Sequence, residues 1–572
     1  MLNRSFGGKE KTIEGLLRPF NVPGWKKAHT PMYCIMTLRQ IDKCVSKQTI
    51  RGGASPLGSD DLNMLMEALV VSGTPDKPLN SSLAAQAVFL LLKLGVSPGQ
   101  SVFDKLIPLA SQADECQDVC SLTWSIASCA SDSNNGIPDI LLDLYHQSVT
   151  KALSRVDALC SKDIGLAKAG LPLPSQVVDT CCRRKDLKLR EAVHILWAVV
   201  KSAGEWRPEL DTLVPVVRRE WIEPNARDAI MAIWALVHSG DPSTIAWAVS
   251  PERLSGISMI QVNDQDRSSY AFALGQAVST MSILKVAPQL MKLEECITIN
   301  SSPREMSFFL WACASASRYP SGAMGILSDW VVKWYPQLCE DVGNAVRILW
   351  TVAIFDGRGA DAVVPLLYPI FRQQPLRSFS SKEAAITLWS LFAVCGCKDI
   401  EFARQLATQI NSYERAHRAQ LYQVSLTLKQ PLSTDPGTKA LSSSALHTKV
   451  CRILGSEWSH EYAVVPGVVV DIAKANDKIA VEVNGAHHYI QYLNDAQRKF
   501  PDGATSWKTR YLTRLGWKAA SLVEDDVRAV SHLPLIEQRK TLINMIEKSA
   551  YESKCFWSCQ LVLYTVVTYV VD

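Results

Sequence analysis

The sequence VVVDIAKANDKIAVEVNGAHHY, residues Val468 to Tyr489, decides the fold of the C-terminal part of this chain. Apolar residues alternate in two β-rich runs, Val468 to Ala473 and Lys478 to Val483, which flank Asn476-Asp477. Asn and Asp tolerate the positive φ that a tight turn requires. The stretch therefore predicts a β-hairpin whose loop is centred on Asn476-Asp477.

The predicted register places two acids opposite each other. With this loop, Asp471 faces Glu482 and Ala473 faces Ala480. The other face of the hairpin is expected to pack on a core and carries Val468, Val470, Ile472, Ile479, Val481 and Val483. Opposed like charges are destabilising unless a cation intervenes or one acid keeps its proton. We expect a divalent metal ion, an arginine, a lysine or a phosphate-bound cation there, and a hard metal between paired carboxylates is the nuclease solution.

The residues that follow the hairpin carry a family resemblance. They include Trp507, Lys508, Arg510 and Leu512, and then Leu515-Gly516-Trp517. In this order and together with the hairpin, they resemble the RAP domain, an RNA-associated module of organellar proteins abundant in apicomplexan parasites. The resemblance covers roughly Ser459 to Val527. It implies a small α/β, restriction-endonuclease-like fold related to the PD-(D/E)XK and very-short-patch-repair nucleases.

The resemblance also defines a candidate site. Asp471 and Glu482 would be the catalytic and metal-binding acids of an active nuclease, with Mg²⁺ as the only cofactor expected. Asn484 stands where active nucleases have Lys, so we expect no catalysis and no cofactor unless Lys508 or Arg510 reaches in as a substitute. The residues that the resemblance assigns to RNA contact are Asn484, Gly485, His488, Tyr489, Lys508, Arg510 and Arg514.

The chain before the linker shows a helical repeat. A small or apolar stretch ends in Leu-Trp or an equivalent, with the Trp position at 124, 197, 234, 275, 311, 350 and 389. A period near 37 residues predicts an α-solenoid of helical hairpins, similar to the heptatricopeptide repeats that accompany RAP domains. We expect each Trp to pack between repeats, although a base-stacking role is the alternative. The basic cluster at Arg183 and Arg184 is a candidate phosphate contact, or else a solvated helix end.

The predicted organisation is mostly α. A basic extension covers residues 1–54, the repeat array 55–428, a Ser/Pro-rich linker 429–447, the RAP domain 448–530, and a closing helix with an apolar tail 531–572. The extension carries nine Lys or Arg against three acids, and a mitochondrial presequence, a retained RNA-binding arm and a solvated extension are its three interpretations. The sixteen cysteines are expected to be buried thiols, and no run is long enough to span a membrane.

Three functional hypotheses follow. The first is a mitochondrial RNA-binding RAP protein, most simply a non-catalytic component of the mitochondrial ribosome or of another ribonucleoprotein, with rRNA and ribosomal proteins as partners; a plastid is the alternative organelle. The second is an organellar RNA processing or stability factor, including a metal-dependent endoribonuclease. The third is a protein-binding solenoid scaffold. The net charge of only +4 requires any RNA surface to be local.

Overall fold

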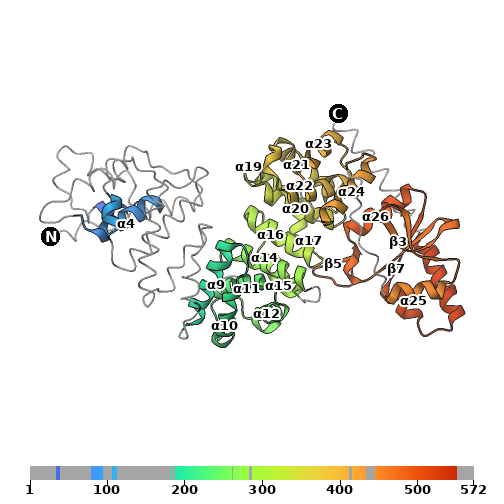
Figure 1. The fold of residues 1–572 in the computed structure, drawn as a ribbon, viewed down its shortest axis with the longest axis horizontal. Helices are drawn as coiled ribbons and strands as arrows, with labels where there is room; N and C mark the ends of the chain where they lie inside the picture. Colours follow the sequence, from blue (N-terminus) through green and yellow to red (C-terminus); the bar gives the residue numbers. More distant parts are fainter. Residues whose placement is uncertain are drawn as a thin grey trace. The chain divides into compact units, whose positions relative to one another are not determined.

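The computed structural model describes residues 34–38, 41, 79–93, 106–112, 182, 187–259, 262–281, 286–410, 415–432 and 445–550. It is mostly helical, with a small C-terminal sheet region (Figure 1). The chain divides into two compact units, Met1–Ala248 and Val249–Asp572. Most of the predicted basic extension, Thr123-Trp124, the candidates Arg183 and Arg184, and the apolar tail lie outside the described residues.

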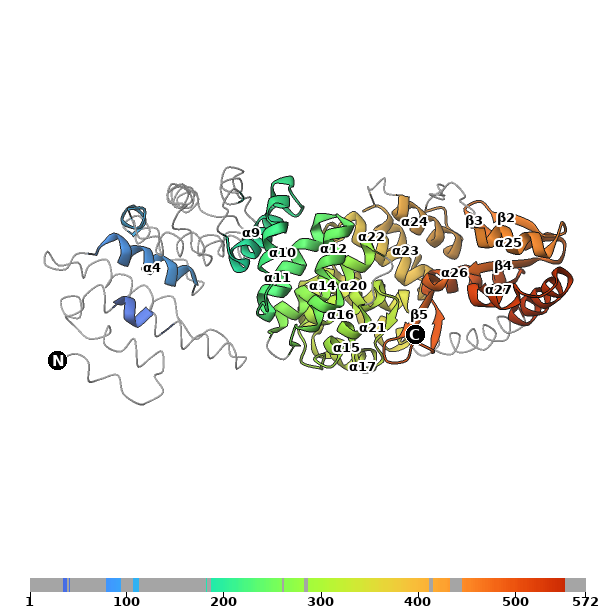
Figure 2. The same ribbon diagram turned by 90° about the horizontal axis from the view of Figure 1, so that it is seen from below.

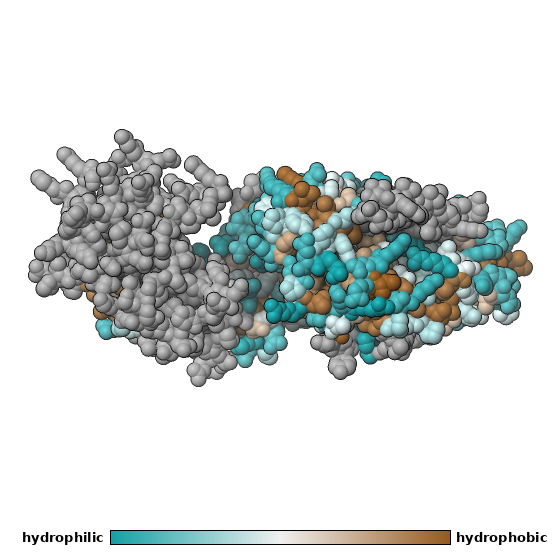
Figure 3. Space-filling view, turned by 90° about the horizontal axis from the view of Figure 1, so that it is seen from above, coloured by the Kyte–Doolittle hydropathy of each residue, from teal (hydrophilic) through white to brown (hydrophobic). Residues whose placement is uncertain are grey.

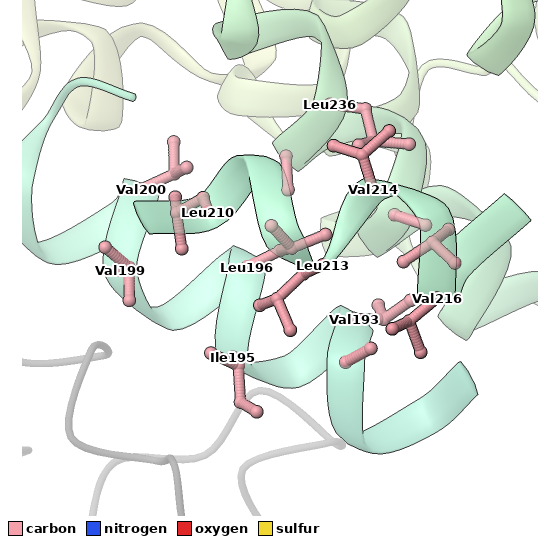
Figure 4. Packing of buried hydrophobic residues seen from close by; sticks show 14 of the residues in the cluster. Val193, Ile195, Leu196, Val199, Val200, Leu210, Leu213, Val214, Val216 and Leu236 are labelled. Carbon is pink, nitrogen blue, oxygen red and sulfur yellow. The ribbon is translucent and has the colours of Figure 1, made fainter. Parts of the chain in front are cut away.

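The first unit has a helical core between residues 189 and 248. Buried apolar residues of α9, α10 and α11 meet there, among them Leu196, Leu213 and Leu236 (Figure 4). Trp197 and Trp234, one predicted period apart, are half-buried, and their ring centroids lie 6.4 Å apart. The helices of this unit are α4 (Ser81–Lys93), α9 (Leu189–Ala203), η5 (Pro208–Thr212), α10 (Val214–Glu220), α11 (Ala226–Leu236), η6 (Val237–Ser239) and α12 (Pro242–Ala248).

The second unit begins with residues 249–432, which we call the helical region. The helix α14 packs on α16, α16 on α20, and α20 on α22. Its elements are α13 (Pro251–Ser255), α14 (Asp264–Thr280), α15 (Ala287–Glu294), α16 (Pro303–Ser315), β1 (Arg318–Tyr319), α17 (Ser321–Gly325), α18 (Leu327–Lys333), α19 (Tyr335–Glu340), α20 (Val342–Ile354), α21 (Ala360–Gln373), η8 (Leu376–Ser378), α22 (Ser381–Leu388), the π-helix η9 (Trp389–Val394), α23 (Ile400–Ala407) and α24 (Arg415–Leu428).

The recurring Leu-Trp pair has an equivalent environment in each of these packed helices. Its Leu is fully buried in α14, α16, α20 and α22. In α16 the following Trp311 stacks on Phe272 of α14, with ring centroids 5.5 Å apart and 19° between the planes. Trp311 also covers Gly275, where an added Cβ would lie only 2.7 Å from Trp311 Cε3. The α14 copy of the repeat therefore lacks a Trp because the next Trp occupies that space. At this position the Trp packs between helices, as predicted.

We expect Gly275→Ala to lower the free energy of unfolding by about 1–3 kcal/mol, the usual cost of overpacking a filled site. A thermal melt of the full chain followed by circular dichroism measures the change. Gly256→Ala is the matched control, because an added Cβ at Gly256 meets no atom within 4 Å. Adding Trp311→Leu to Gly275→Ala frees the space, so the double variant should lose less stability than the two single losses added together. Equal melts for the two Ala variants would contradict this packing.

Residues 445–550 form the second part of this unit, which we call the sheet module. One sheet has the strand order β2-β3-β4-β7, with β2, β3 and β4 antiparallel and β7 parallel to β4. Figure 2 shows α25 and α27 grouped with these strands. The elements are α25 (Ala445–Leu454), β2 (Ser459–Val465), β3 (Val468–Lys474), η10 (Ala475–Asp477), β4 (Ile479–Asn484), η11 (Ala486–His488), β5 (Tyr489–Tyr492), β6 (Lys499–Pro501), α26 (Gly503–Arg514), β7 (Lys518–Val523) and α27 (Glu524–Val530), followed by a helix over residues 535–550.

The hairpin register agrees with the prediction. Ala473 pairs with Ala480 and Ile472 with Val481, the register that would place Asp471 opposite Glu482. The predicted apolar face is buried except for the half-buried Ile479, and its core also takes residues from α25 and, beyond the expected boundary at residue 530, from the helix over residues 535–550. The turn differs in one respect. The positive φ, 52°, falls at Lys478 and not at Asn476-Asp477, because the loop starts with a 3₁₀ turn over Ala475–Asp477 that only a left-handed residue can close.

The described surface is mixed in character. On the face shown in Figure 3, hydrophilic residues cover much of the described surface and hydrophobic residues form separate patches. Within the described ranges, no helix combines the length and apolar composition that a membrane crossing requires. The cysteines in these ranges are free thiols, half of them buried: Cys34, Cys182, Cys296, Cys313, Cys339, Cys395, Cys397 and Cys451.

Candidate nucleic-acid interface

The two facing acids of the hairpin are compensated by a lysine. Lys508, on α26, places its Nζ 2.6 Å and 2.7 Å from the two carboxylate oxygens of Glu482. Asp471 uses one of its oxygens to accept the backbone N–H of Val483 at 2.7 Å, and His447 Nε2 lies 3.6 Å from the same oxygen. Of the compensating groups expected from the sequence, the structure supplies a lysine, Lys508, from the helix that follows the hairpin.

The environment of Glu482 changes its acidity. Burial raises the pKa of Glu482 from 4.5 to about 7; the charge of Lys508 opposes this shift, and the charge of Asp471 adds to it. Because the pKa in the folded chain is raised, the contribution of Glu482 to stability is fully present below pH 4.5 and is lost as the pH rises through about 7. The Glu482 carboxyl group is therefore a proton acceptor with a midpoint near neutral pH.

A carboxyl ¹³C NMR titration of selectively labelled full-length protein should place the midpoint of Glu482 near pH 7. Lys508→Met should move this midpoint upward, because it removes a charge that favours the carboxylate. Asp471→Asn should move it downward, because it removes a charge that opposes the carboxylate. Lys518→Met, which removes an exposed lysine from β7, should leave it unchanged. A midpoint that ignores Lys508→Met would refute this account of the pair.

The donor set at these acids gives limited support to a metal. Mg²⁺ is usually held by one or two carboxylates together with substrate phosphates. Here the oxygens of Glu482 are shared with Lys508, and Asp471 already accepts a backbone N–H. Within the described part of the chain, no group of three or more His, Cys, Asp or Glu side chains is arranged to hold a metal ion. The two acids are thus already engaged by groups of the chain itself.

The end of β4 and the loop after it are held by hydrogen bonds to side chains of β7 and α26. Asn484 is 2% exposed and donates from Nδ2 to Ser521 Oγ at 2.8 Å. The Tyr489 hydroxyl lies 2.9 Å from the same Oγ, and burial raises the pKa of Tyr489. His488 Nδ1 lies 3.2 Å from Thr505 Oγ1, and burial lowers the pKa of His488. Gly485 lies beside the His487 ring, which an added Cβ would approach to 3.1 Å. Among these predicted RNA contacts, Asn484 is thus the one fixed in the interior.

The predicted contacts on α26 are divided between the interior and solvent. Arg510 donates to Asp356 of the helical region at 2.8 Å and to the Val394 carbonyl at 3.3 Å. Its side chain is 18% exposed and that of Asp356 is 10% exposed. Arg514, one turn later, is exposed. Trp507 is buried and donates from Nε1 to Thr427 Oγ1 at 2.9 Å. Lys508 and Arg510 are therefore both paired with acids, and Arg510 joins two parts of the chain.

Further contacts fasten the sheet module to the helical region. Strand β5 pairs in parallel with β1, and Figure 1 shows β5 beside α17, the helix that follows β1. Tyr319 of β1 packs its ring against Tyr492 and Phe500 of the sheet module, at centroid distances of 5.0 Å and 5.5 Å. Arg358 lies 4.0 Å above the Phe500 ring. Strand pairing and ring contacts thus hold the sheet module against the helical region.

A glycine at the start of α26 allows the sheet module to approach the helical region closely. Gly503 begins α26 directly against the end of α20, where an added Cβ would collide with the Ala353 carbonyl group, 2.9 Å from its carbon. Asp502, the residue before it, caps α26 by accepting the Thr505 N–H at 2.8 Å. The lack of a side chain at this position therefore allows the capped end of α26 to reach the helical region.

We expect Arg510→Met to lower the free energy of unfolding by about 3–5 kcal/mol, because it leaves the Asp356 carboxylate buried without its partner. The double variant Arg510→Met, Asp356→Asn should recover part of this loss, since neither charge then stays buried and Asn also tolerates the positive φ of residue 356. Chemical denaturation of the full chain measures both. Arg528→Met, which breaks an ion pair that is 74% and 49% exposed, should change stability by less than about 1 kcal/mol. Equal losses for Arg510→Met and Arg528→Met would contradict the buried pair.

Comparison with known proteins gives a distant relative. No family model matches the chain. A protein of Oryza sativa subsp. japonica named "RAP domain-containing protein, chloroplastic" is 23% identical over 327 residues, which cover 49% of this chain and 48% of the rice protein. The comparison supports a RAP domain in this chain. The chain spans about half the length of this relative.

Several site residues were not found from the sequence. Asp356, Ser521 and Thr427 each hold a predicted RAP residue, yet all three lie outside the hairpin and α26. His447 lies beside Asp471 and belongs to α25, where a lone His carries no recognisable signal. Asp356 has a positive φ of 56° shortly after α20, a conformation that Asp adopts readily. This conformation does not indicate a partner for its side chain.

Proposed function

We propose that this chain is an organellar RNA-binding RAP protein that acts as a non-catalytic part of a ribonucleoprotein. The observation that carries the proposal is its similarity to a RAP domain-containing protein over about half of each chain. The geometry adds support. The RAP-like residues sit in a module fastened to a long helical region, and such a combined surface suits an extended RNA better than a small ligand.

The finer assignment concerns the particle and the organelle. We propose rRNA as the RNA and a mitochondrial ribosome as the particle, because the chain has many Trp and a net charge of only +4, as suits a protein lodged among other proteins. The plastid is the alternative, and the name of the rice relative, which ends in "chloroplastic", is compatible with it. An α-solenoid along the predicted repeats would supply the long surface.

A second candidate function is a metal-dependent endoribonuclease, and one observation favours it. Asn484 occupies the position where active nucleases have a lysine, but Lys508 brings an amino group to Glu482 from a different element. Asp471 and Glu482 would bind Mg²⁺ in such an enzyme. A third candidate, a protein-binding scaffold, uses the same helical region without RNA.

We expect the tagged full-length protein, purified from its native organelle, to carry RNA that sequencing identifies as rRNA in near-stoichiometric amount. It should co-sediment with ribosomal proteins in a sucrose gradient. Recovery as a free monomer without RNA would reject the RNA-binding function and leave the scaffold.

The same preparation tests cleavage. Part of it is incubated with Mg²⁺ or Mn²⁺, and new RNA ends are mapped. New ends that disappear in both Asp471→Ala and Glu482→Ala, but persist in the surface control Glu524→Ala, would establish the nuclease. Sub-stoichiometric transcripts without cleavage would indicate a processing or stability factor in place of a ribosome component.

A further inference from the structure

A basic residue recurs at one register of the helices that carry the Leu-Trp signature. Seven residues before the Trp position, four of the six described helices have Arg or Lys, and all four side chains are exposed. Lys and Arg account for 60 of 572 residues, so composition does not explain this recurrence. The four are Arg190 in α9, Arg227 in α11, Arg304 in α16 and Lys382 in α22; α14 and α20 have Ser268 and Gly343 there.

The helix start does not require a cation at this register. In each helix the basic residue is the second helical position, as Arg304 is in α16 and Lys382 in α22. A positive charge in the first turn opposes the helix macrodipole, which favours anions at this end. Favourable interaction with the helix dipole therefore does not explain why these cations recur.

The acid that follows each basic residue serves the helix start or the interior, and its charge remains beside the cation. Glu191 accepts the Lys188 N–H at 3.0 Å, and Glu383 accepts the Ser380 N–H at 2.9 Å. Asp228 accepts from Asn225 Nδ2 at 2.6 Å. Glu305 is 2% exposed and paired with Arg267 at 2.5 Å. The carboxylates thus face the helix ends or the interior, and the neighbouring cations are exposed.

Aromatic rings continue the same surface between α14, α16 and α20. Phe308 lies one turn after Arg304 and receives two guanidinium groups, Arg304 at 5.7 Å and Arg347 of α20 at 4.5 Å from its centroid. Phe272 meets Phe308 edge to face at 5.4 Å. In α20, where the register holds Gly343, Arg347 supplies the cation one turn later. We call Arg304, Phe308, Arg347 and Lys382 the basic strip.

Two acids border the strip and limit its charge at α20. An added Cβ at Gly343 would lie 3.2 Å from both Asp341 Oδ1 and Glu383 Oε1. Asp341 accepts from Asn344 Nδ2 at 2.8 Å, and Asn344 Oδ1 in turn accepts from Arg347 at 3.0 Å. Arg347 is therefore an oriented part of the strip, and Arg304 and Lys382 are its exposed charges.

We propose that the basic strip binds the phosphodiester backbone of single-stranded RNA, with Arg304 and Lys382 as phosphate contacts and Arg347 and Phe308 as their support. This inference rests on the proposed RNA-binding function and locates its electrostatic contact. Packed helices are spaced by about 8–10 Å, so one cation per helix forms a row along which an anionic chain can lie. Arg190 and Arg227 repeat the arrangement in the first unit.

The charge distribution favours RNA over a protein as the occupant. In the sheet module, Lys508 and Arg510 are held by Glu482 and Asp356, which restricts their contact with phosphate. The basic strip instead presents Arg304, Arg347 and Lys382 on three successively packed helices, with Asp341 and Glu383 at its border, and a row of cations suits a regularly spaced anion. A protein interface of this size would be expected to have a larger apolar centre.

The test compares two neutralised pairs in the full-length chain. Arg304→Gln, Lys382→Gln removes two cations of the strip; Lys292→Gln, Lys398→Gln removes two exposed cations of α15 and of the turn after η9. Fluorescence anisotropy with a random-sequence single-stranded RNA is measured over a range of salt concentrations. The strip variant should bind roughly tenfold more weakly for every sequence. Its slope of log K against log salt should be shallower by about 1.4, which is two contacts at about 0.7 each.

The control pair should keep the wild-type slope. Thermal melts separate binding from folding, because loss of a first-turn cation should leave the melting temperature unchanged or raise it. If the wild-type chain binds RNA and both pairs behave alike, the strip is not the contact, while the proposed function stands. If the strip variant loses affinity for polyglutamate but not for RNA, the strip binds an acidic protein and this inference is overturned. If the wild-type chain binds no RNA, the proposed function fails together with the strip.

Discussion

The buried ion pair between Arg510 and Asp356 is the constraint on which the arrangement of the second unit depends. A buried charge is tolerated only when its partner is in place, and here the partners belong to different parts of the chain. Asp356 adopts a left-handed backbone two residues after α20, and Arg510 also reaches the carbonyl of Val394, the last residue of η9. A buried contact therefore joins the helical region and the sheet module, although the sequence between them is an apparent linker.

The same reasoning about charge connects the two candidate surfaces. Glu482 of the sheet module and Asp356 of the helical region pair with Lys508 and Arg510, two cations that the family resemblance assigns to RNA. In the helical region, acids such as Glu383 and Glu305 cap a helix or pair in the interior, and the cations beside them are exposed. A near-neutral chain can thus present local positive charge, because where each acid is used matters more than the total. The RAP-like residues hold the module in place, and the helices provide the exposed cations.

Local patterns predicted what depends on neighbours in the sequence. Alternation of apolar residues predicted the hairpin register and the face that is buried, apart from the half-buried Ile479. The position of the positive φ was wrong, since the loop geometry and not the residue type places it at Lys478. The partner of Arg510 lies 154 residues away, and nothing in a single sequence indicates such a contact. The basic residues seven positions before the Trp position in four of the six described helices are visible in the sequence, but their place at the helix starts became clear only from the structure.

The pairing of β1 with β5 gives the chain an order of assembly. Arg318 and its partner Gln491 are 173 residues apart (491 minus 318), so this strand pair closes a long loop. During synthesis the helices around β1 emerge first and can pack locally, since helical contacts are short in sequence. The two-residue strand β1 then offers a ready edge to the later β5–β6 hairpin. A nascent chain that stops before residue 491 would expose this edge together with the unpaired carboxylate of Asp356, two features by which a quality-control factor would distinguish an unfinished chain from a finished one.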